Sequence, residues 1–121
     1  MKIESYEDLI VWQKAMSLTT EVYRLVKLLP KEETYALSDQ MRRAAVSIPS
    51  NIAEGQSRGS TKEFVYFLGI ASGSVAELNT QLLICERTNL LLPDTTAQAK
   101  KLCAEIGKML HALSQSLPTA Q

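Results

Sequence analysis

The sequence has few of the residues that build sheets, tight turns or cross-links. Aromatic residues make up 6% of the 121 residues, and there are only five glycines, four prolines and two cysteines. The low aromatic content argues against a sheet. The small number of glycines and prolines indicates few turns between secondary-structure elements. Hydrophobic residues still make up 45% of the chain, which suits helices packed on helices. The composition therefore favours a single all-α domain, and the chain is long enough to form one core.

An excess of charge of either sign is also missing. Thirteen Lys and Arg balance thirteen Asp and Glu, so no overall field attracts nucleic acid or an anionic membrane, and any such binding needs a local patch. The first residues lack the apolar run of a signal peptide, and no stretch reaches the ~18 uncharged residues of a membrane span. We expect a cytoplasmic protein without a membrane partner.

Three breaks divide the chain into four segments with helical apolar periodicity. The pattern predicts helices at about 6–29, 35–54, 60–88 and 93–116, with Gly55 placed to end the second. Because the connections are short, neighbouring helices should run antiparallel in an up-and-down four-helix bundle. Ser5 with Asp8, and Ser60 with Glu63, are spaced as N-terminal caps. Pro49 lies inside the second segment and predicts either a kink or a break into two helices.

The first helix carries two apolar stripes. One stripe has the spacing of a face directed toward the core. Its members are Trp12, Ala15, Met16, Thr19, Val22, Tyr23, Val26 and Leu29. The other repeats every seven residues on a flank. Because a lone bundle does not need to bury both stripes, we predict that the flanking one forms the interface of a homo-oligomer. Its members are Val11, Leu18 and Leu25.

Polar residues line one side of the second helix, next to its core positions. The third helix offers Glu77 and Gln81 one turn apart. We interpret these side chains as a buried polar network that fixes the helix register, with Arg43 paired to Glu77. The alternative is a solvated face. The predicted members of the network are Gln40, Arg43, Ser47, Asn51, Glu54, Glu77 and Gln81.

One catalytic pattern is present in the chain. Residues 55–59 fit G-x-S-x-G, and Ser57, Asp94 and His111 follow the order of an α/β-hydrolase triad. That motif requires a strained turn between a strand and a helix, and no segment has the pattern of a strand. A di-metal site in a bundle requires Glu-x-x-His pairs, but His111 is the single histidine and Lys108 stands three residues before it. We therefore expect no catalytic residue, no metal and no cofactor.

The two cysteines are expected to be free. Cys85 and Cys103 both occupy apolar positions of helical patterns, where a reduced thiol behaves as a small hydrophobic residue. If their helices run antiparallel, the two thiols lie several residues out of level, at ~1.5 Å for each residue of offset. This offset does not suit a disulfide.

Longer motifs resemble one known family. They are Tyr6-x-x-Leu9-x-Val11-Trp12-Gln13-x-Ala15, Leu37-x-x-Gln40-x-Arg42-Arg43-Ala44-Ala45-x-Ser47-Ile48-Pro49-x-Asn51-Ile52-Ala53-Glu54-Gly55 and Ala71-x-Gly73-Ser74-x-x-Glu77-Leu78-x-x-Gln81-Leu82. The chain resembles the bacterial four-helix bundle proteins, some of which are encoded by intervening sequences within large-subunit ribosomal RNA genes. The accessory variability protein of diversity-generating retroelements has the same fold. The resemblance implies a left-handed up-and-down bundle assembled as a homopentameric ring, with a dimer as the alternative.

The resemblance also implies a role with nucleic acid, because the retroelement relative binds nucleic acid together with reverse transcriptase. That relative is strongly basic, whereas this chain is neutral. Two hypotheses follow. In the first, an oligomeric scaffold binds RNA or DNA weakly through Arg42, Arg58 and Lys62, which we predict to lie near one end of the bundle. In the second, a protein–protein adaptor presents the ring to another protein and makes no contact with nucleic acid.

Overall fold

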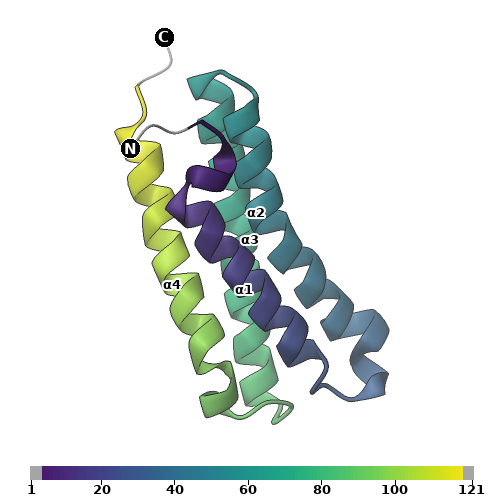
Figure 1. The fold of residues 1–121 in the computed structure, drawn as a ribbon. Coiled ribbons are helices and arrows are strands. Elements are labelled where there is room, and N and C mark those ends of the chain that lie inside the picture. The colour runs from purple at the N-terminus through teal and green to yellow at the C-terminus, as the bar shows by residue number, and fades with distance from the viewer. Residues whose placement is uncertain (1–3, 119–121) are drawn as a thin grey trace.

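The computed structural model describes residues 4–118 and contains four long helices. They are α1 (Ile10–Val26), α2 (Asp39–Ser57), α3 (Thr61–Arg87) and α4 (Pro93–Ser116). The helices run alternately up and down, and each contacts the next along the chain (Figure 1). Helix α1 also contacts α4, which closes the bundle. No strand occurs within the described residues. The predicted all-α, up-and-down four-helix bundle is confirmed.

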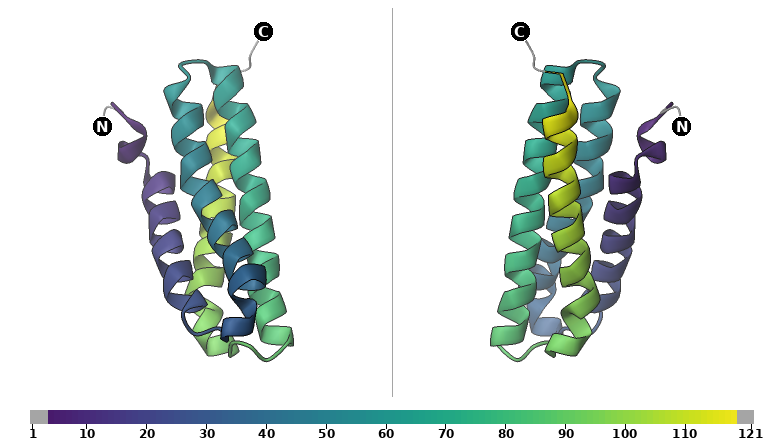
Figure 2. Two further views of the ribbon diagram at one scale, coloured as in Figure 1. Left: turned by 90° about the vertical axis from the view of Figure 1, so that its right-hand side faces the viewer. Right: turned by 90° about the vertical axis from the view of Figure 1, so that its left-hand side faces the viewer.

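Every helix contributes large side chains to a single core. Leu18, Ile48, Leu78 and Ile106, one from each helix, are fully buried. Burying a side chain of this size stabilises the fold by about 1.5–3 kcal/mol relative to leaving it in water. The packing is not uniform along the bundle, because the N-terminal half of α1 leans away from the other three helices (Figure 2).

The chain begins with a separate turn rather than with the first helix. Tyr6–Asp8 form a 3-10 turn, Leu9 is extended, and α1 starts at Ile10. The capping box predicted at Ser5 and Asp8 is present, since Asp8 Oδ2 accepts from the Ser5 N–H at 3.1 Å. It closes only this turn, so the predicted start at residue 6 is four residues too early. Helix α1 also ends at Val26 rather than near residue 29.

Helix α2 starts and ends later than predicted. A 3-10 turn (Lys31–Glu33) and a π-helical turn (Thr34–Ser38) precede it. At its other end the helix continues through Gly55 to Ser57, so the prediction that Gly55 ends it is wrong. A Cβ atom at Gly55 would lie 2.7 Å from the Phe67 Cβ. Glycine is present because α2 and α3 approach closely there.

Pro49 lies within a continuous helix, so the predicted break into two helices is wrong and the kink is the alternative that remains. Proline cannot donate a hydrogen bond to the carbonyl four residues earlier, which is that of Ala45. The Thr19 hydroxyl on α1 lies 3.1 Å from the Ala45 carbonyl oxygen, with hydrogen-bonding geometry. The same hydroxyl lies 2.9 Å from the Ala15 carbonyl oxygen. Because the hydroxyl carries one proton, its donation is divided between the two carbonyls, and the neighbouring helix replaces part of the hydrogen bond that Pro49 removes.

Helices α3 and α4 agree with the predicted bounds to within one residue. The Ser60 hydroxyl accepts a hydrogen bond from the Glu63 N–H at 3.3 Å, as the capping motif predicted. Cys85 and Cys103 are both free and buried, also as predicted. Burial raises the pKa of the Cys85 thiol, and it raises the pKa of Cys103 to about 12.

Candidate interaction surfaces

The predicted oligomer interface lies inside the core. Leu18 and Leu25 are fully buried and Val11 is 4% exposed, so none of them is available to a partner. Together with the buried Ala15 and Val22, they alternate steps of four and three residues, which is the seam spacing of packed helices. The prediction that Val11, Leu18 and Leu25 form an interface is therefore wrong.

The stripe assigned to the core is divided, because Ala15, Val22, Val26 and Leu29 are buried as predicted but its other apolar members are not. Met16 and Tyr23 are each 43% exposed, and Trp12 is only partly buried. Helix α1 therefore does carry more apolar surface than the core needs, but this surface is formed by Trp12, Met16 and Tyr23 and not by the flanking stripe. We call these three residues the exposed stripe. The exposed stripe lies beside α2.

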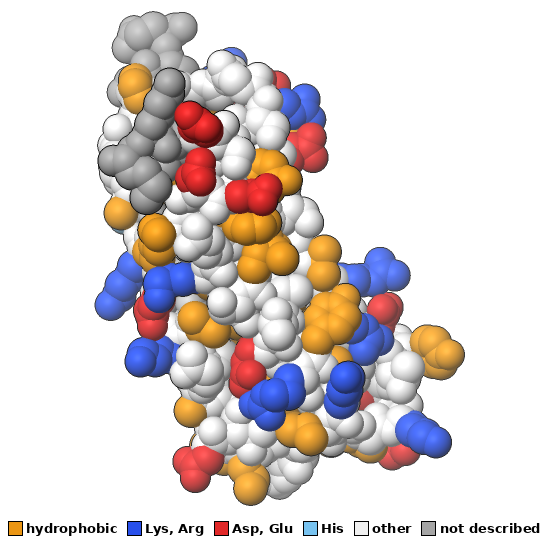
Figure 3. All heavy atoms as spheres, in the orientation of Figure 1, with side chains coloured by type: hydrophobic (Ala, Val, Ile, Leu, Met, Phe, Trp, Pro, Cys, Tyr) orange, Lys and Arg blue, Asp and Glu red, His pale blue; other side chains and the backbone are white. Residues whose placement is uncertain are grey.

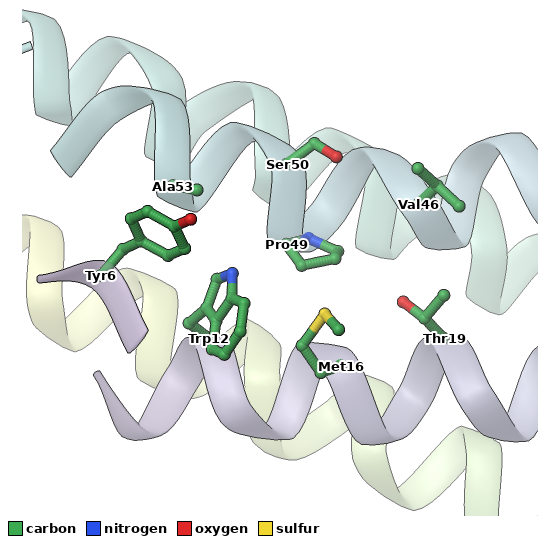
Figure 4. A pocket seen from close by; sticks show the side chains of 8 residues that line it. All are labelled: Tyr6, Trp12, Met16, Thr19, Val46, Pro49, Ser50 and Ala53. Carbon is green, nitrogen blue, oxygen red and sulfur yellow. The ribbon is translucent and has the colours of Figure 1, made fainter. Parts of the chain in front are cut away.

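A groove runs between α1 and α2. Its first part is a cavity of about 320 Å³ with an apolar lining, which the outward lean of α1 leaves open (Figure 4). The rings of Tyr6 and Trp12 meet edge to face at its upper end, with centroids 5.3 Å apart. The lining residues are Tyr6, Trp12, Met16, Thr19, Val46, Pro49, Ser50 and Ala53.

The groove continues into a second cavity of about 440 Å³, which shares Val46 and Ser50 with the first. Its other lining residues are Tyr23, Asp39, Arg42, Arg43 and Ser47. Arg43 Nε donates to Asp39 Oδ2 at 3.2 Å. Within residues 4–118, no carboxylate lies within 4 Å of Arg42. We call the two cavities together the α1–α2 groove; its lower end carries an unpaired positive charge.

Charge is distributed unevenly along this face. Acidic side chains predominate at the upper end, where the chain begins, and Lys and Arg become frequent toward the opposite end (Figure 3). The upper acidic residues are Glu4, Glu7 and Asp8. The lower basic residues, around the α1–α2 connection, are Arg24, Lys27, Lys31, Arg42 and Arg43. The same region also contains Glu21, Glu32, Glu33 and Asp39, so five positive charges face four negative ones there and the lower end is only slightly basic.

The residues predicted to bind nucleic acid do not lie together. Arg42 is in the first turn of α2 and Arg58 follows its last residue, which separates them by about 24 Å along the helix axis. Lys62 is close to Arg58 but lines a different cavity, against the end of α4. The prediction that all three share one end of the bundle is therefore wrong for Arg42.

Arg58 is also neutralised by its neighbours. Its guanidinium lies 2.7 Å from Glu54 Oε2 and 3.8 Å from Glu63 Oε1. The same group lies 5.1 Å from the centroid of the Phe67 ring, a cation–π distance. Two carboxylates therefore oppose the attraction that one guanidinium would exert on a phosphate.

The predicted polar network is divided into separate groups. Ser74 Oγ donates to Ser47 Oγ at 2.7 Å, and Asn51 Nδ2 donates to Ser47 Oγ at 2.9 Å. Separately, Gln81 Nε2 donates to Glu77 Oε2 at 3.3 Å. The predicted Arg43–Glu77 pair is wrong, because the mostly exposed Arg43 side chain pairs with Asp39 one turn away. Two further members lie outside both groups, since Glu54 pairs with Arg58 and Gln40 is exposed.

Helix α3 has an apolar face directed toward solvent. Between Glu63 and Glu86 its only charged residue is Glu77. A Cβ atom added at Gly69 or Gly73 would meet nothing within 4 Å, so packing within the monomer does not require either glycine. We call this surface the α3 outer face; its apolar residues and glycines are Val65, Tyr66, Gly69, Ile70, Gly73, Leu83 and Ile84. The exposed Glu77 and Thr80 lie on the same side of the helix, between Gly73 and Leu83.

The candidate catalytic residues are far apart. Asp94 and His111 both lie on α4 and are separated by about 26 Å along its axis, so they do not form a triad with Ser57. Residues 4–118 contain no group of three or more His, Cys, Asp and Glu arranged to hold a metal ion. Over the same residues, no helix has the length and apolar character needed to cross a membrane.

Most of the chain matches one known protein family. A family model described as the 23S rRNA-intervening sequence protein matches residues 7–112. The chain belongs to this family. The matched region contains the whole α3 outer face and every residue of the α1–α2 groove except Tyr6, so both surfaces lie in the part that the 23S rRNA-intervening sequence family model covers.

A solved structure is similar over most of the chain. It is a crystal structure of a protein with unknown function from the S23 ribosomal protein family of Bacteroides thetaiotaomicron VPI-5482. The two chains superpose with a TM-score of 0.82 and 25% sequence identity, over 88% of this chain and 100% of the other. No curated protein matches the sequence significantly. Neither the 23S rRNA-intervening sequence family description nor this structural relative names an enzymatic activity.

Proposed function

We propose that this 23S rRNA-intervening sequence protein is a cytoplasmic, non-enzymatic binding scaffold that acts as a homo-oligomer. The α3 outer face is the observation that carries the proposal. A helix that is apolar on all sides is normally buried, yet in a single copy five large hydrophobic side chains of α3 remain exposed. A second copy packed on this face would remove them from water.

The glycines of α3 support a helix as the covering element. Each glycine inside a helix costs roughly 1 kcal/mol relative to alanine. At Gly69 and Gly73 no contact within the monomer offsets this cost. A helix of another copy that approached these positions closely would offset it, because the bare backbone permits a shorter distance between helix axes.

The proposed number of copies is five, as the family resemblance implies, with two as the alternative. A closed ring of five requires the α3 outer face to pack against a different surface of the next copy, whereas a dimer packs the same face against itself. In the dimer the α1–α2 groove stays separate, because it shares no residue with the α3 outer face. In a ring of five it stays separate only when the α3 outer face packs against a surface outside the groove, and Val46→Glu tests this because it would then leave the mass unchanged.

Size-exclusion chromatography with light scattering tests the assembly. The expected mass is about five times the 13.4 kDa of one chain, or twice that value for the dimer. Val65→Glu should reduce it to one chain. Val46→Glu is the matched control, because Val46 lies outside α3 and is 41% exposed against 40% for Val65. A wild-type monomer at micromolar concentration would refute the scaffold.

A second candidate function is weak binding of RNA or DNA at the basic end of the bundle. It is supported by Lys27, Lys31 and Arg42, which have no carboxylate partner within 4 Å among the described residues. One copy offers few such charges, but repetition in an oligomer can raise avidity by about 10²–10⁴ on a long polyanion. Binding should therefore strengthen with nucleic-acid length and weaken steeply with salt.

The nucleic-acid hypothesis is tested by titrating long and short RNA and DNA at two salt concentrations. A Lys27→Glu, Lys31→Glu double variant should lose binding. The control is Lys62→Glu, Lys108→Glu, which makes the same change of charge elsewhere on the surface. If the wild type does not bind at low salt, or if both variants lose binding equally, the protein–protein adaptor is the better description.

A further inference from the structure

The α1–α2 groove is a second exposed apolar surface, and it shares no residue with the α3 outer face. We propose that the α1–α2 groove binds one amphipathic α-helix of another protein. That helix carries acidic side chains at the end over Arg42 and basic side chains at the end near Glu7. The proposal goes beyond self-assembly, because the partner is a different protein and the contact lies outside the α3 outer face.

The dimensions of the groove fit a short helix. On α1 the exposed stripe extends from Trp12 to Tyr23, about 17 Å at the helical rise per residue, and on α2 the lining extends from Asp39 to Ala53, about 21 Å. A helix of about 12–14 residues covers this length. Two adjacent helices also present the ridges and grooves into which a third helix packs.

The middle of the groove is suited to apolar side chains. Trp12 and Met16 on α1 and Val46 on α2 point into the space between the two helices (Figure 4). Methionine is flexible and adapts to the shape of an incoming side chain. This is the arrangement in which an amphipathic helix places apolar residues at i, i+3, i+4 and i+7 into a hydrophobic groove.

Charged residues line the lower end of the groove, and an acidic residue adjoins its upper end in the sequence. Arg42 at the lower end has no carboxylate partner among residues 4–118, while Arg43 beside it is already paired with Asp39. Glu7 at the upper end is exposed and adjoins Tyr6, which lines the groove. Complementary charges at the two ends of the bound helix would set its direction, because the reverse orientation places like charges together.

The same features argue against a nucleic-acid strand along the groove. A strand carries negative phosphates along its whole length, and these would meet Glu7 at one end and an uncharged lining in the middle. Only the lower end offers cations. An elongated ligand with one acidic end, an apolar middle and one basic end matches the complete groove.

Trp12 provides a direct measurement, because it is the single tryptophan of the chain and lines the groove. The probe is a synthetic helical peptide of about 14 residues, without tryptophan or tyrosine, with an apolar stripe, two glutamates at one end and two lysines at the other. One control peptide has the same composition without the stripe. A second control keeps the stripe and carries lysines at both ends. The first peptide should shift Trp12 emission saturably, the stripe-free peptide should not, and the all-lysine peptide should bind about tenfold more weakly.

Protein variants locate the site. Val46→Glu should weaken binding of the first peptide by roughly tenfold or more. Ser50→Glu is a second variant, at an exposed position that both cavities share, and it should have the same effect. Val65→Glu, with the same substitution on α3, should leave the affinity unchanged. Arg42→Glu should reverse the preference, so that the all-lysine peptide binds more tightly than the first. Circular dichroism confirms that each variant keeps its helix content.

Several results would overturn the proposal. One is the absence of a saturable change in Trp12 emission at millimolar peptide; another is a change that Val46→Glu and Ser50→Glu leave intact. A single-stranded oligothymidylate that shifts the emission when the peptide does not would assign the groove to nucleic acid instead. The mass of every sample is measured in parallel. If the oligomer is retained but does not bind the peptide, only the proposal for the groove is contradicted. If the protein is a monomer that binds the peptide, only the proposed homo-oligomer is contradicted.

Discussion

Thr19→Val should destabilise the protein because it removes the hydroxyl that compensates for Pro49. The Ala45 carbonyl lacks the N–H four residues later from which a helical carbonyl normally accepts, since residue 49 is proline. The Thr19 hydroxyl of the neighbouring helix lies 3.1 Å from the Ala45 carbonyl oxygen and takes that role in part, since its one proton is shared with the Ala15 carbonyl at 2.9 Å. Valine has nearly the same shape, so the substitution removes the hydrogen bond with little change in packing.

The expected cost follows from the burial of the site. Thr19 is partly buried, and leaving a carbonyl without a partner in such a position costs about 1–2 kcal/mol. In a Pro49→Ala background, the new N–H can donate to the Ala45 carbonyl. There Thr19→Val should cost less than about 0.5 kcal/mol, so the double-mutant cycle should give a coupling of roughly 1 kcal/mol.

Urea unfolding monitored by circular dichroism measures the four corners of the cycle. All variants are compared at one protein concentration, because the stability of an oligomer depends on concentration. Thr20→Val is the matched control, since the exposed Thr20 hydroxyl donates only within α1, to the Met16 carbonyl at 3.1 Å. Equal costs of Thr19→Val in the wild-type and Pro49→Ala backgrounds would refute the role assigned to this hydroxyl.

Three further predictions concern packing, thiol reactivity and pH. Gly55→Ala would place a Cβ atom 2.7 Å from the Phe67 Cβ, and we expect it to cost about 1–3 kcal/mol in urea unfolding; a neutral effect would contradict the close approach of α2 and α3. Because burial raises the pKa of Cys103 to about 12, a thiol reagent at neutral pH should label it only after unfolding, and rapid labelling of the native protein would contradict this. Hydrogen bonding from Lys100 lowers the pKa of Glu86, so its contribution to stability is complete above the unfolded value of about 4.3 and is lost as the pH falls through the lower folded value. In the Glu86→Gln variant the free energy of unfolding should therefore fall less steeply as the pH is lowered. An unchanged slope would show that the Glu86–Lys100 pair does not contribute to the acid sensitivity.

Local signals in the sequence determined α3 and α4. Ser60 with Glu63 starts one helix, and Pro93 starts the other at a position where a missing N–H is harmless. The bounds of α1 were less predictable, because a capping box can close a single 3-10 turn as well as a longer helix. At Gly55 the residue type was correctly seen as unusual, but its reason lies in contact with Phe67, which is distant in sequence.

The candidate site could be predicted only in part. The choice between the two stripes of α1 depends on how the helix tilts against α2 and α4, which its own periodicity does not fix. The alternating spacing of Val11, Ala15 and Leu18 was a usable signal that residues of both stripes face the core together. The ion pairs of Arg43 and Arg58 could have been predicted from the sequence, since each arginine pairs with an acidic residue four positions before it. At this spacing, side chains lie close together on any helix.

The separation of the two exposed apolar surfaces has a consequence for how the protein would bind a target. If α3 joins the copies, each copy still presents its own α1–α2 groove. A single amphipathic helix would then bind a monomer and an oligomer with equal affinity. A target that presents several such helices would bind the oligomer more tightly by about 10²–10⁴, because the later contacts become intramolecular. Val65→Glu should therefore abolish the preference for the multivalent target while preserving binding of the single helix, and Val46→Glu should abolish both.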